Sequence, residues 1–141
     1  MSSGTKLKWL GNMAFDVELN NHHFTIDADA RVGGKDQGPR PKPLLLSALA
    51  GCTGMDVVSI LKKMKVEDYQ LELTADGDST EEHPKYYHTI YLDYKFTGED
   101  LPLDKIRKAV KLSEERYCGV SEMLRQAAKI NTRILVNGKE I

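Results

Sequence analysis

The two cysteines carry the most reactive side chains in this sequence of 141 residues. Cys52 lies between Ala50-Gly51 and Thr53-Gly54, and such small neighbours let a substrate or another backbone approach closely. Cys118 stands just before the expected start of a helix, where the positive end of the helix dipole favours a thiolate. Free cysteine is also among the most buried residue types. In a reducing compartment the two thiols are therefore either inert core residues or reactive ones, and not a structural disulfide.

The spacing of the cysteines does not by itself bring the two sulfurs together. They are 66 positions apart, and a disulfide needs Cα atoms within about 7 Å. A redox pairing of the two cysteines therefore cannot be inferred from their spacing alone.

Asp56 lies one helical turn after Cys52, at i+4, and shares a helix face with it. It could accept a hydrogen bond at a site or lie buried at an interface. A carboxylate beside a thiol raises the pKa of the thiol and opposes its activation, so we interpret Asp56 as structural. The histidines have no zinc-like spacing with either cysteine, so we expect no metal site; they are His22, His23, His83 and His88.

Composition narrows the class of protein. The length fits one domain, residues 1–141, and 40% of the residues are hydrophobic. A net charge of −1 gives no electrostatic footprint for nucleic acid. No run approaches the roughly 20 apolar residues that span a bilayer, and the first ten residues lack the apolar core of a secretory signal. We therefore expect a cytoplasmic protein without a membrane partner.

Hydrophobic periodicity indicates strands and helices in the order β-β-β-α-β-β-α-α-β. Asn20-Asn21 is a plausible tight turn, and the Gly- and Pro-rich stretch 32–43 is a loop, mobile in part. Runs of strands around one central helix are typical of an α+β fold with antiparallel sheets. The expected strands cover 6–10, 14–19, 22–28, 70–75, 86–96 and 130–136, and the expected helices 44–66, 103–117 and 120–128.

The first half of the central helix, Leu44 to Cys52, is apolar or small on all sides. A helix of this kind must be buried on most of its surface. One sheet covers one side only, so the pattern favours a homodimer in which paired helices cover one another. A monomer whose other helices cover the same surface is the alternative.

Two motifs resemble signatures of the OsmC/Ohr superfamily. The run Pro41 to Leu61 resembles the central helix of OsmC-like proteins, with a proline-led start, a Leu/Ala run, a cysteine and Met-Asp-Val-Val. The run Tyr117 to Ser121 resembles the second cysteine motif, Cys-Pro-Val-Ser, with Gly119 in place of the proline. The resemblance implies an OsmC-like α+β fold over the whole chain and an intertwined homodimer with sites at its interface.

The resemblance also implies a chemistry. Well-studied members are thiol-dependent peroxidases, of the hydroperoxide reductase type, that reduce organic hydroperoxides in the oxidative stress response. Cys52 would be the peroxidatic thiolate and become a sulfenic acid. Cys118 would condense with it to a disulfide, and a lipoyl or thioredoxin-like dithiol would reduce the pair again. No metal or organic cofactor is implied.

Active members activate the thiol with an arginine, which a carboxylate orients. Arg31 matches the arginine position approximately and is the first candidate, and Arg40 is the second. Lys42 and Pro43 stand where the family has its glutamate. This departure leaves two other hypotheses open: a non-enzymatic protein that binds a small apolar ligand, and a redox-sensing thiol protein.

Overall fold

The computed structural model describes residues 2–141. The chain divides into two compact units, one ending at Leu45 and the other comprising Leu46–Ile141. The sequence predicts one domain over residues 1–141, and in the structure this chain contains two compact units.

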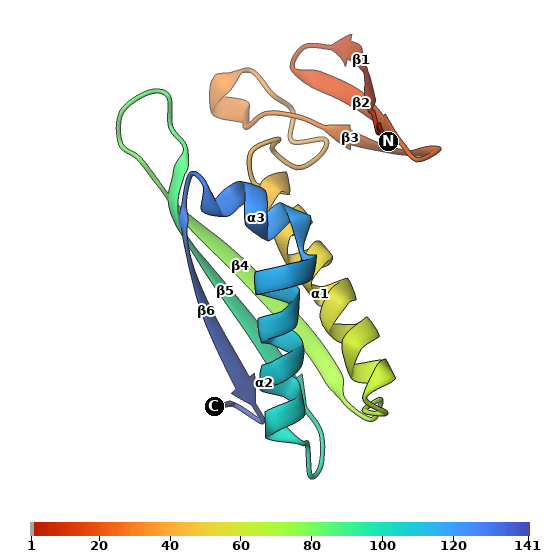
Figure 1. The fold of residues 1–141 in the computed structure, drawn as a ribbon. Coiled ribbons are helices and arrows are strands. Elements are labelled where there is room, and N and C mark those ends of the chain that lie inside the picture. The colour runs from red at the N-terminus through yellow and green to blue at the C-terminus, as the bar shows by residue number, and fades with distance from the viewer. Residues whose placement is uncertain (1) are drawn as a thin grey trace. The chain divides into compact units, whose positions relative to one another are not determined.

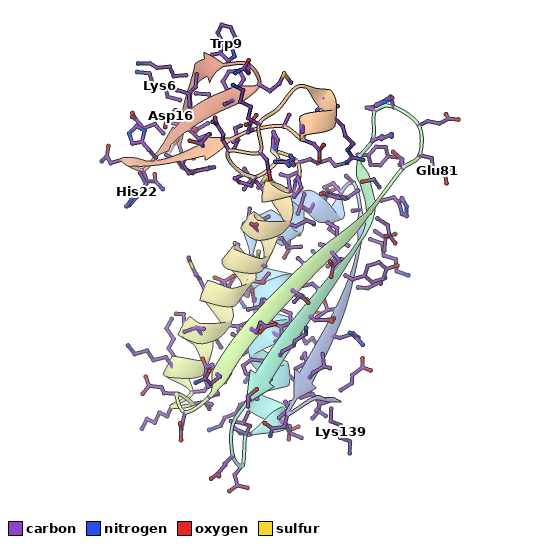
Figure 2. The ribbon with its side chains drawn as sticks, turned by 180° about the vertical axis from the view of Figure 1, so that it is seen from behind. Lys6, Trp9, Asp16, His22, Glu81 and Lys139 are labelled. Carbon is purple, nitrogen blue, oxygen red and sulfur yellow. The ribbon has the colours of Figure 1, made fainter. Side chains whose placement is uncertain are left out.

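The first unit contains a three-stranded antiparallel sheet in the order β1-β2-β3. Its strands are β1 (Lys6–Gly11), β2 (Ala14–Leu19) and β3 (His22–Ile26). Asn20 and Asn21, with φ of 51° and 64°, form the tight turn between β2 and β3, as the sequence predicts. Many apolar side chains of this sheet are exposed, and Trp9 projects from it in Figure 2.

The segment after β3 is ordered by one buried carboxylate. Asp27 accepts backbone N–H groups from Ala28 at 2.7 Å and from Lys35 and Gln37 at 3.1 Å each. These hydrogen bonds hold the pKa of Asp27 below its ordinary value of 3.8. The sequence predicts a loop over residues 32–43, and the structure has one; its first part is gathered around Asp27, next to the 3₁₀ turn η1 (Ala30–Val32).

The second unit contains a four-stranded sheet in the order β4-β5-β6-β7. Its strands are β4 (Gln70–Ser79), β5 (Tyr87–Thr97), β6 (Lys129–Val136) and β7 (Lys139–Glu140). The sheet is antiparallel except for the parallel pair β5–β6. The connection from β5 to β6 holds α2 (Leu103–Leu112), η2 (Ser113–Tyr117) and α3 (Gly119–Arg125), which is long enough for a parallel crossover.

Helix α1 (Leu44–Lys63) and helix α2 lie along the same face of this sheet (Figure 1). Figure 2 looks onto the opposite face, over which no helix of residues 46–141 runs. Strand β5 alternates accordingly, because its even-numbered residues from Ile90 to Phe96 are buried towards the helices. They form the core with Leu49, Val57, Leu61, Ile106 and Val110.

Helix α1 is 20 residues long and strongly apolar. Among the described residues it is a helix of sufficient length and mean hydropathy, 1.8, to cross a membrane by those criteria alone. The sequence has no unbroken apolar run of that length, because Ser47, Gly51 and Asp56 interrupt it, and the core helix of a folded domain can meet the same two criteria. Three fully buried residues, Leu49, Val57 and Leu61, pack one face of α1 into the core.

Candidate functional site: a dithiol with a carboxylate

Cys52, Asp56 and Cys118 form one cluster. The two sulfurs and a carboxylate oxygen of Asp56 all lie within 4.8 Å of one another. Cys52 and Asp56 are one turn apart on α1, and Cys118 is the N-cap of α3. The structure therefore brings together the two cysteines that the sequence separates by 66 positions, and both are free thiols.

A π-helical segment, η2, places the second thiol. Helix α2 ends at Leu112 and continues as η2, whose wider turn ends at Cys118. The Cys118 N–H donates to the Ser113 carbonyl oxygen at 2.7 Å, and the fully buried Ser113 hydroxyl donates to Asp56 Oδ2 at 3.0 Å. Ser113 thus links the Cys118 backbone to the helix that carries Cys52.

Glu114 fastens η2 to the sheet. Its Oε1 accepts hydrogen bonds from Tyr94 Oη at 3.1 Å and Thr132 Oγ1 at 2.7 Å. Arg125 of α3 donates to the Glu114 carbonyl oxygen at 2.7 Å. Burial, and then the negative charge of Glu114, raise the pKa of Tyr94, so its hydroxyl stays protonated and remains a donor. The Cys118 end of the cluster is therefore anchored to β5, β6 and α3.

The surroundings of Cys52 favour the neutral thiol. Burial is the largest cause that raises the pKa of Cys52, followed by a hydrogen bond with Cys118 and the charges of Cys118 and Asp56; a hydrogen bond from the Val120 backbone opposes them. Asp56 makes a structural hydrogen bond with Ser113, as its interpretation as a structural residue expects. It also lies close to both thiols, which that interpretation did not include.

Solvent can reach the cluster from two sides. A hollow of about 400 Å³ is lined by Asp56, Ile60, Leu112 and Tyr117. A second hollow of about 300 Å³ is lined by Cys118 and the residues of η2 before it. Cys52 is half-buried whereas Cys118 is only 3% exposed, so Cys52 is the more accessible thiol.

The candidate arginines belong to the first unit, whereas the thiols belong to the second. Arg31 donates through Nε to Asp29 Oδ1 at 3.0 Å, and its side chain is 87% exposed. Asp29 also caps η1 by accepting the Arg31 N–H at 2.8 Å. Arg40 donates to the Gly38 carbonyl oxygen and to Asp36, each at 2.8 Å.

Asp29, the carboxylate partner of Arg31, was not among the predicted site residues. The family resemblance places the carboxylate at Lys42 and Pro43, near the helix start, where this chain has none. The available signal was local, because an Asp two residues before an Arg can bond both its backbone and its side chain.

Fold and site together define an α+β protein that holds a dithiol between its central helix and a second, short helix. A family model described as OsmC-like protein matches residues 34–133. The chain therefore belongs to the OsmC-like protein family, and the resemblance drawn from its two cysteine motifs is confirmed.

The chain is also similar to individual proteins and solved structures. The chain is 33% identical to Protein YhfA of Escherichia coli (strain K12) over 126 residues, which cover 89% of this chain and 91% of the relative. A crystal structure of a hypothetical protein from Aquifex aeolicus VF5 is 28% identical and covers 97% of both chains, with a TM-score of 0.85. An organic hydroperoxide resistance protein from Elizabethkingia anophelis shares the fold at 14% identity, covering 97% of both chains with a TM-score of 0.71.

Proposed function

We propose that this protein is a thiol peroxidase that reduces organic hydroperoxides through Cys52 and Cys118. The observation that carries the proposal is the separation of the two sulfurs, at most 4.8 Å in the reduced chain. A small shift of either side chain would close a disulfide, so a sulfenic acid on one thiol has its resolving partner in place. Family relatives named for organic hydroperoxide resistance support the substrate class.

The reaction proceeds in three balanced steps. The Cys52 thiolate attacks the distal peroxide oxygen, the O–O bond breaks, and the leaving alkoxide takes a proton to become an alcohol. The Cys118 sulfur then attacks the sulfenic acid, forming the disulfide and releasing water. An external dithiol, lipoyl or thioredoxin-like, exchanges with that disulfide, restores both thiols and leaves as its own disulfide.

Cys52 is assigned the attack because it is the more accessible sulfur. Its thiolate is disfavoured within the second unit, so an external cation is needed. We assign that part to Arg31, since its guanidinium is exposed and Asp29 orients it, whereas Arg40 is held by Gly38 and Asp36.

The protein acts as a homodimer in this proposal. Only 28% of the apolar window of α1 is buried within the chain. An open apolar groove of about 570 Å³ runs between α1 and the edge strand β4; it is lined by Ala50, Gly51, Met55, Val58, Leu71 and Leu73. A second copy is favoured over lipid, because a bilayer excludes open sheet edges and disfavours a carboxylate such as Asp56 midway along a helix.

A redox-sensing role is the second candidate, and the raised pKa of Cys52 favours it. A thiol that ionises little at neutral pH reacts slowly and suits a sensor better than an efficient catalyst. Both roles need reduced thiols at rest, which supports a cytoplasmic location.

The test is turnover of cumene hydroperoxide by the reduced protein with dihydrolipoate, in the presence of a chelator. Cys52→Ser should abolish turnover. Cys118→Ser should still consume one equivalent of peroxide, leaving a sulfenic acid that dimedone traps, because the attacking thiol remains. Arg31→Gln should slow the peroxide step by roughly 10- to 100-fold, the loss of one charge-assisted interaction.

Matched controls are Ser47→Ala, exposed on the same helix as Cys52, and Arg107→Gln, an exposed arginine of α2 paired with Asp104. Both should keep full activity. Full activity in Cys52→Ser would overturn the peroxidase assignment. Slow consumption of a single equivalent of peroxide by the native protein, with no further turnover when dihydrolipoate is added, would favour the sensor.

A further inference from the structure

Asp56 takes no part in the peroxidase reaction proposed above. Two sulfurs are enough to reduce a peroxide, and a carboxylate facing them repels the thiolate that the reaction needs. The Asp56 oxygen nevertheless lies within 4.8 Å of both sulfurs, on the same helix face as Cys52. Three groups that are anionic when deprotonated converge on one point, an arrangement that a cation would stabilise.

The ligand set matches one class of cation. Two thiolates and a carboxylate are common zinc ligands, with Zn–S bonds of about 2.3 Å and Zn–O bonds of about 2.0–2.2 Å. Tetrahedral bonds of that length place two sulfurs about 3.7 Å apart. The separations in the cluster are at most 4.8 Å, so the ligands would need to close by only about an ångström.

The ligands also have the supporting hydrogen bonds that orient a metal site. The Ser113 hydroxyl donates to Asp56 Oδ2 at 3.0 Å, which leaves the other carboxylate oxygen for a metal. The Ser121 N–H donates to Cys118 Sγ at 3.3 Å. Both supporting groups belong to buried residues, Ser113 at 0% and Ser121 at 1% exposure.

A second, independent observation points to an occupant. Ser121 Oγ is buried and has no hydrogen-bond partner among the described residues 2–141, and its own backbone N–H bonds the Cys118 sulfur. Buried hydroxyl groups nearly always have a partner. An unsatisfied polar atom thus belongs to the residue that donates to the Cys118 sulfur, and the hollows beside Asp56 and Cys118 leave room for a water at the fourth position of a metal.

We propose that the reduced protein binds one zinc ion through Cys52, Asp56 and Cys118, with the fourth position open to water. Binding displaces one proton from each thiol, so one Zn²⁺ enters and two H⁺ leave, with no change in oxidation state. The prediction of no metal rested on the spacing of the histidines and on the family resemblance, and neither takes Asp56 into account as a ligand. The ion and the disulfide exclude each other, since both use the same two sulfurs.

The test is titration of the fully reduced protein with Co²⁺ in the absence of oxygen and peroxide, followed by displacement with Zn²⁺. Thiolate-to-cobalt charge-transfer absorption should saturate at one ion per chain, and Zn²⁺ should abolish it. The same protein oxidised to the Cys52–Cys118 disulfide should bind no ion; this arm needs no substitution and no refolding.

Variants assign the ligands. Cys52→Ser and Cys118→Ser should each lose the charge-transfer band at stoichiometric Co²⁺. Asp56→Asn should weaken Zn²⁺ by at least 10-fold and Ser113→Ala by roughly 10- to 100-fold, whereas Asp56→Glu should bind more tightly than Asp56→Asn because it keeps the carboxylate. Asp104→Asn, an exposed carboxylate on α2, should bind as the native protein does.

Absence of charge-transfer absorption in the reduced native protein, or equal Zn²⁺ affinity in Asp56→Asn and native protein, would overturn the proposal. The metal assay contains no peroxide and the turnover assay contains a chelator. Failure of one is therefore distinguishable from failure of the other.

Discussion

Asp27 is a buried carboxylate whose partners are all backbone N–H groups of one loop, at Ala28, Lys35 and Gln37. Its pKa lies below the ordinary 3.8, so the folded chain prefers the ionised form more than the unfolded chain does. The stabilisation is therefore fully present above about pH 4 and disappears as the pH falls through the folded-state pKa. Acid should loosen this loop before it affects the rest of the chain.

Asp27→Asn should remove that acid-dependent step, because an amide oxygen does not titrate. The measurement is amide hydrogen exchange at Lys35 and Gln37 between about pH 5 and pH 2, compared after correction for the intrinsic exchange rate. Asp100→Asn is the control, since Asp100 is exposed and Asn tolerates its positive φ of 49°. Loop protection in Asp27→Asn that falls with acid as in the native protein would contradict this assignment.

At the scale of residues, the closeness of Cys52 and Cys118 followed from the family resemblance of the short motifs around them and not from their spacing. It did not predict the hydrogen bond from Ser113 to Asp56, because that contact joins residues 57 positions apart. The pair Asp29–Arg31 was within reach of local reasoning, whereas the convergence of Asp56 on Cys118 depends on how α1 packs beside η2.

Among the elements, η2 is the one that determines where Cys118 lies, and Glu114 ties it to the sheet. Tyr94→Phe removes one of the two hydroxyl donors to the Glu114 side chain and leaves Thr132. We expect the free energy of unfolding to fall by about 1 kcal/mol, the typical net value of one such hydrogen bond. Urea denaturation followed by circular dichroism measures it.

The matched control for Tyr94→Phe is Tyr91→Phe on the same strand. Tyr91 is exposed on the sheet face opposite the helices, so its substitution should change the free energy of unfolding by less than about 0.5 kcal/mol. Equal stability of the two variants would show that the Glu114 contact contributes nothing to the fold.

Most helices and strands were predicted to within a few residues, because alternation in β5 and helical spacing in α1 and α2 are local signals, whereas the two-residue strand β7 was not predicted. The exceptions have tertiary causes. Helix α1 ends at Lys63 rather than Val66, and Lys65 then adopts a left-handed φ of 62°. The single helix expected over 103–117 divides at Leu112 into α2 and a π-helical turn. The parallel pairing of β5 with β6 follows from the crossover connection between them. The sequences of the two strands do not by themselves indicate whether the strands pair in parallel.

For the whole molecule, the open groove between α1 and β4 is the feature that bears on assembly. Met55 is 77% exposed there, and a lysine in its place would bury an unpaired charge in a dimer. Met55→Lys should raise the dimer dissociation constant by roughly 100-fold or more, a loss of about 3 kcal/mol. Sedimentation equilibrium over a range of concentrations measures this constant.

Met123→Lys provides the comparison for Met55→Lys. Met123 is 67% exposed on α3 and does not line the groove, so this variant should sediment as the native protein does. A native protein that is monomeric at all concentrations would contradict the homodimer. The apolar surface of the central helix already favoured a homodimer from the sequence. The groove could not be predicted in the same way, because it forms only where β4 lies beside α1 at the edge of the sheet.

The short distance between the two sulfurs also has a consequence for the thermal stability of the protein. A disulfide between Cys52 and Cys118 would link the middle of α1 covalently to the start of α3 and close a loop of 66 positions. A cross-link over that length removes enough freedom from the unfolded chain to add about 4 kcal/mol, on the order of 10 °C in melting temperature. Calorimetry of peroxide-treated and reduced protein should resolve two melting points, and Cys118→Ser should show one, so the melting curve itself would report which fraction of the protein is oxidised.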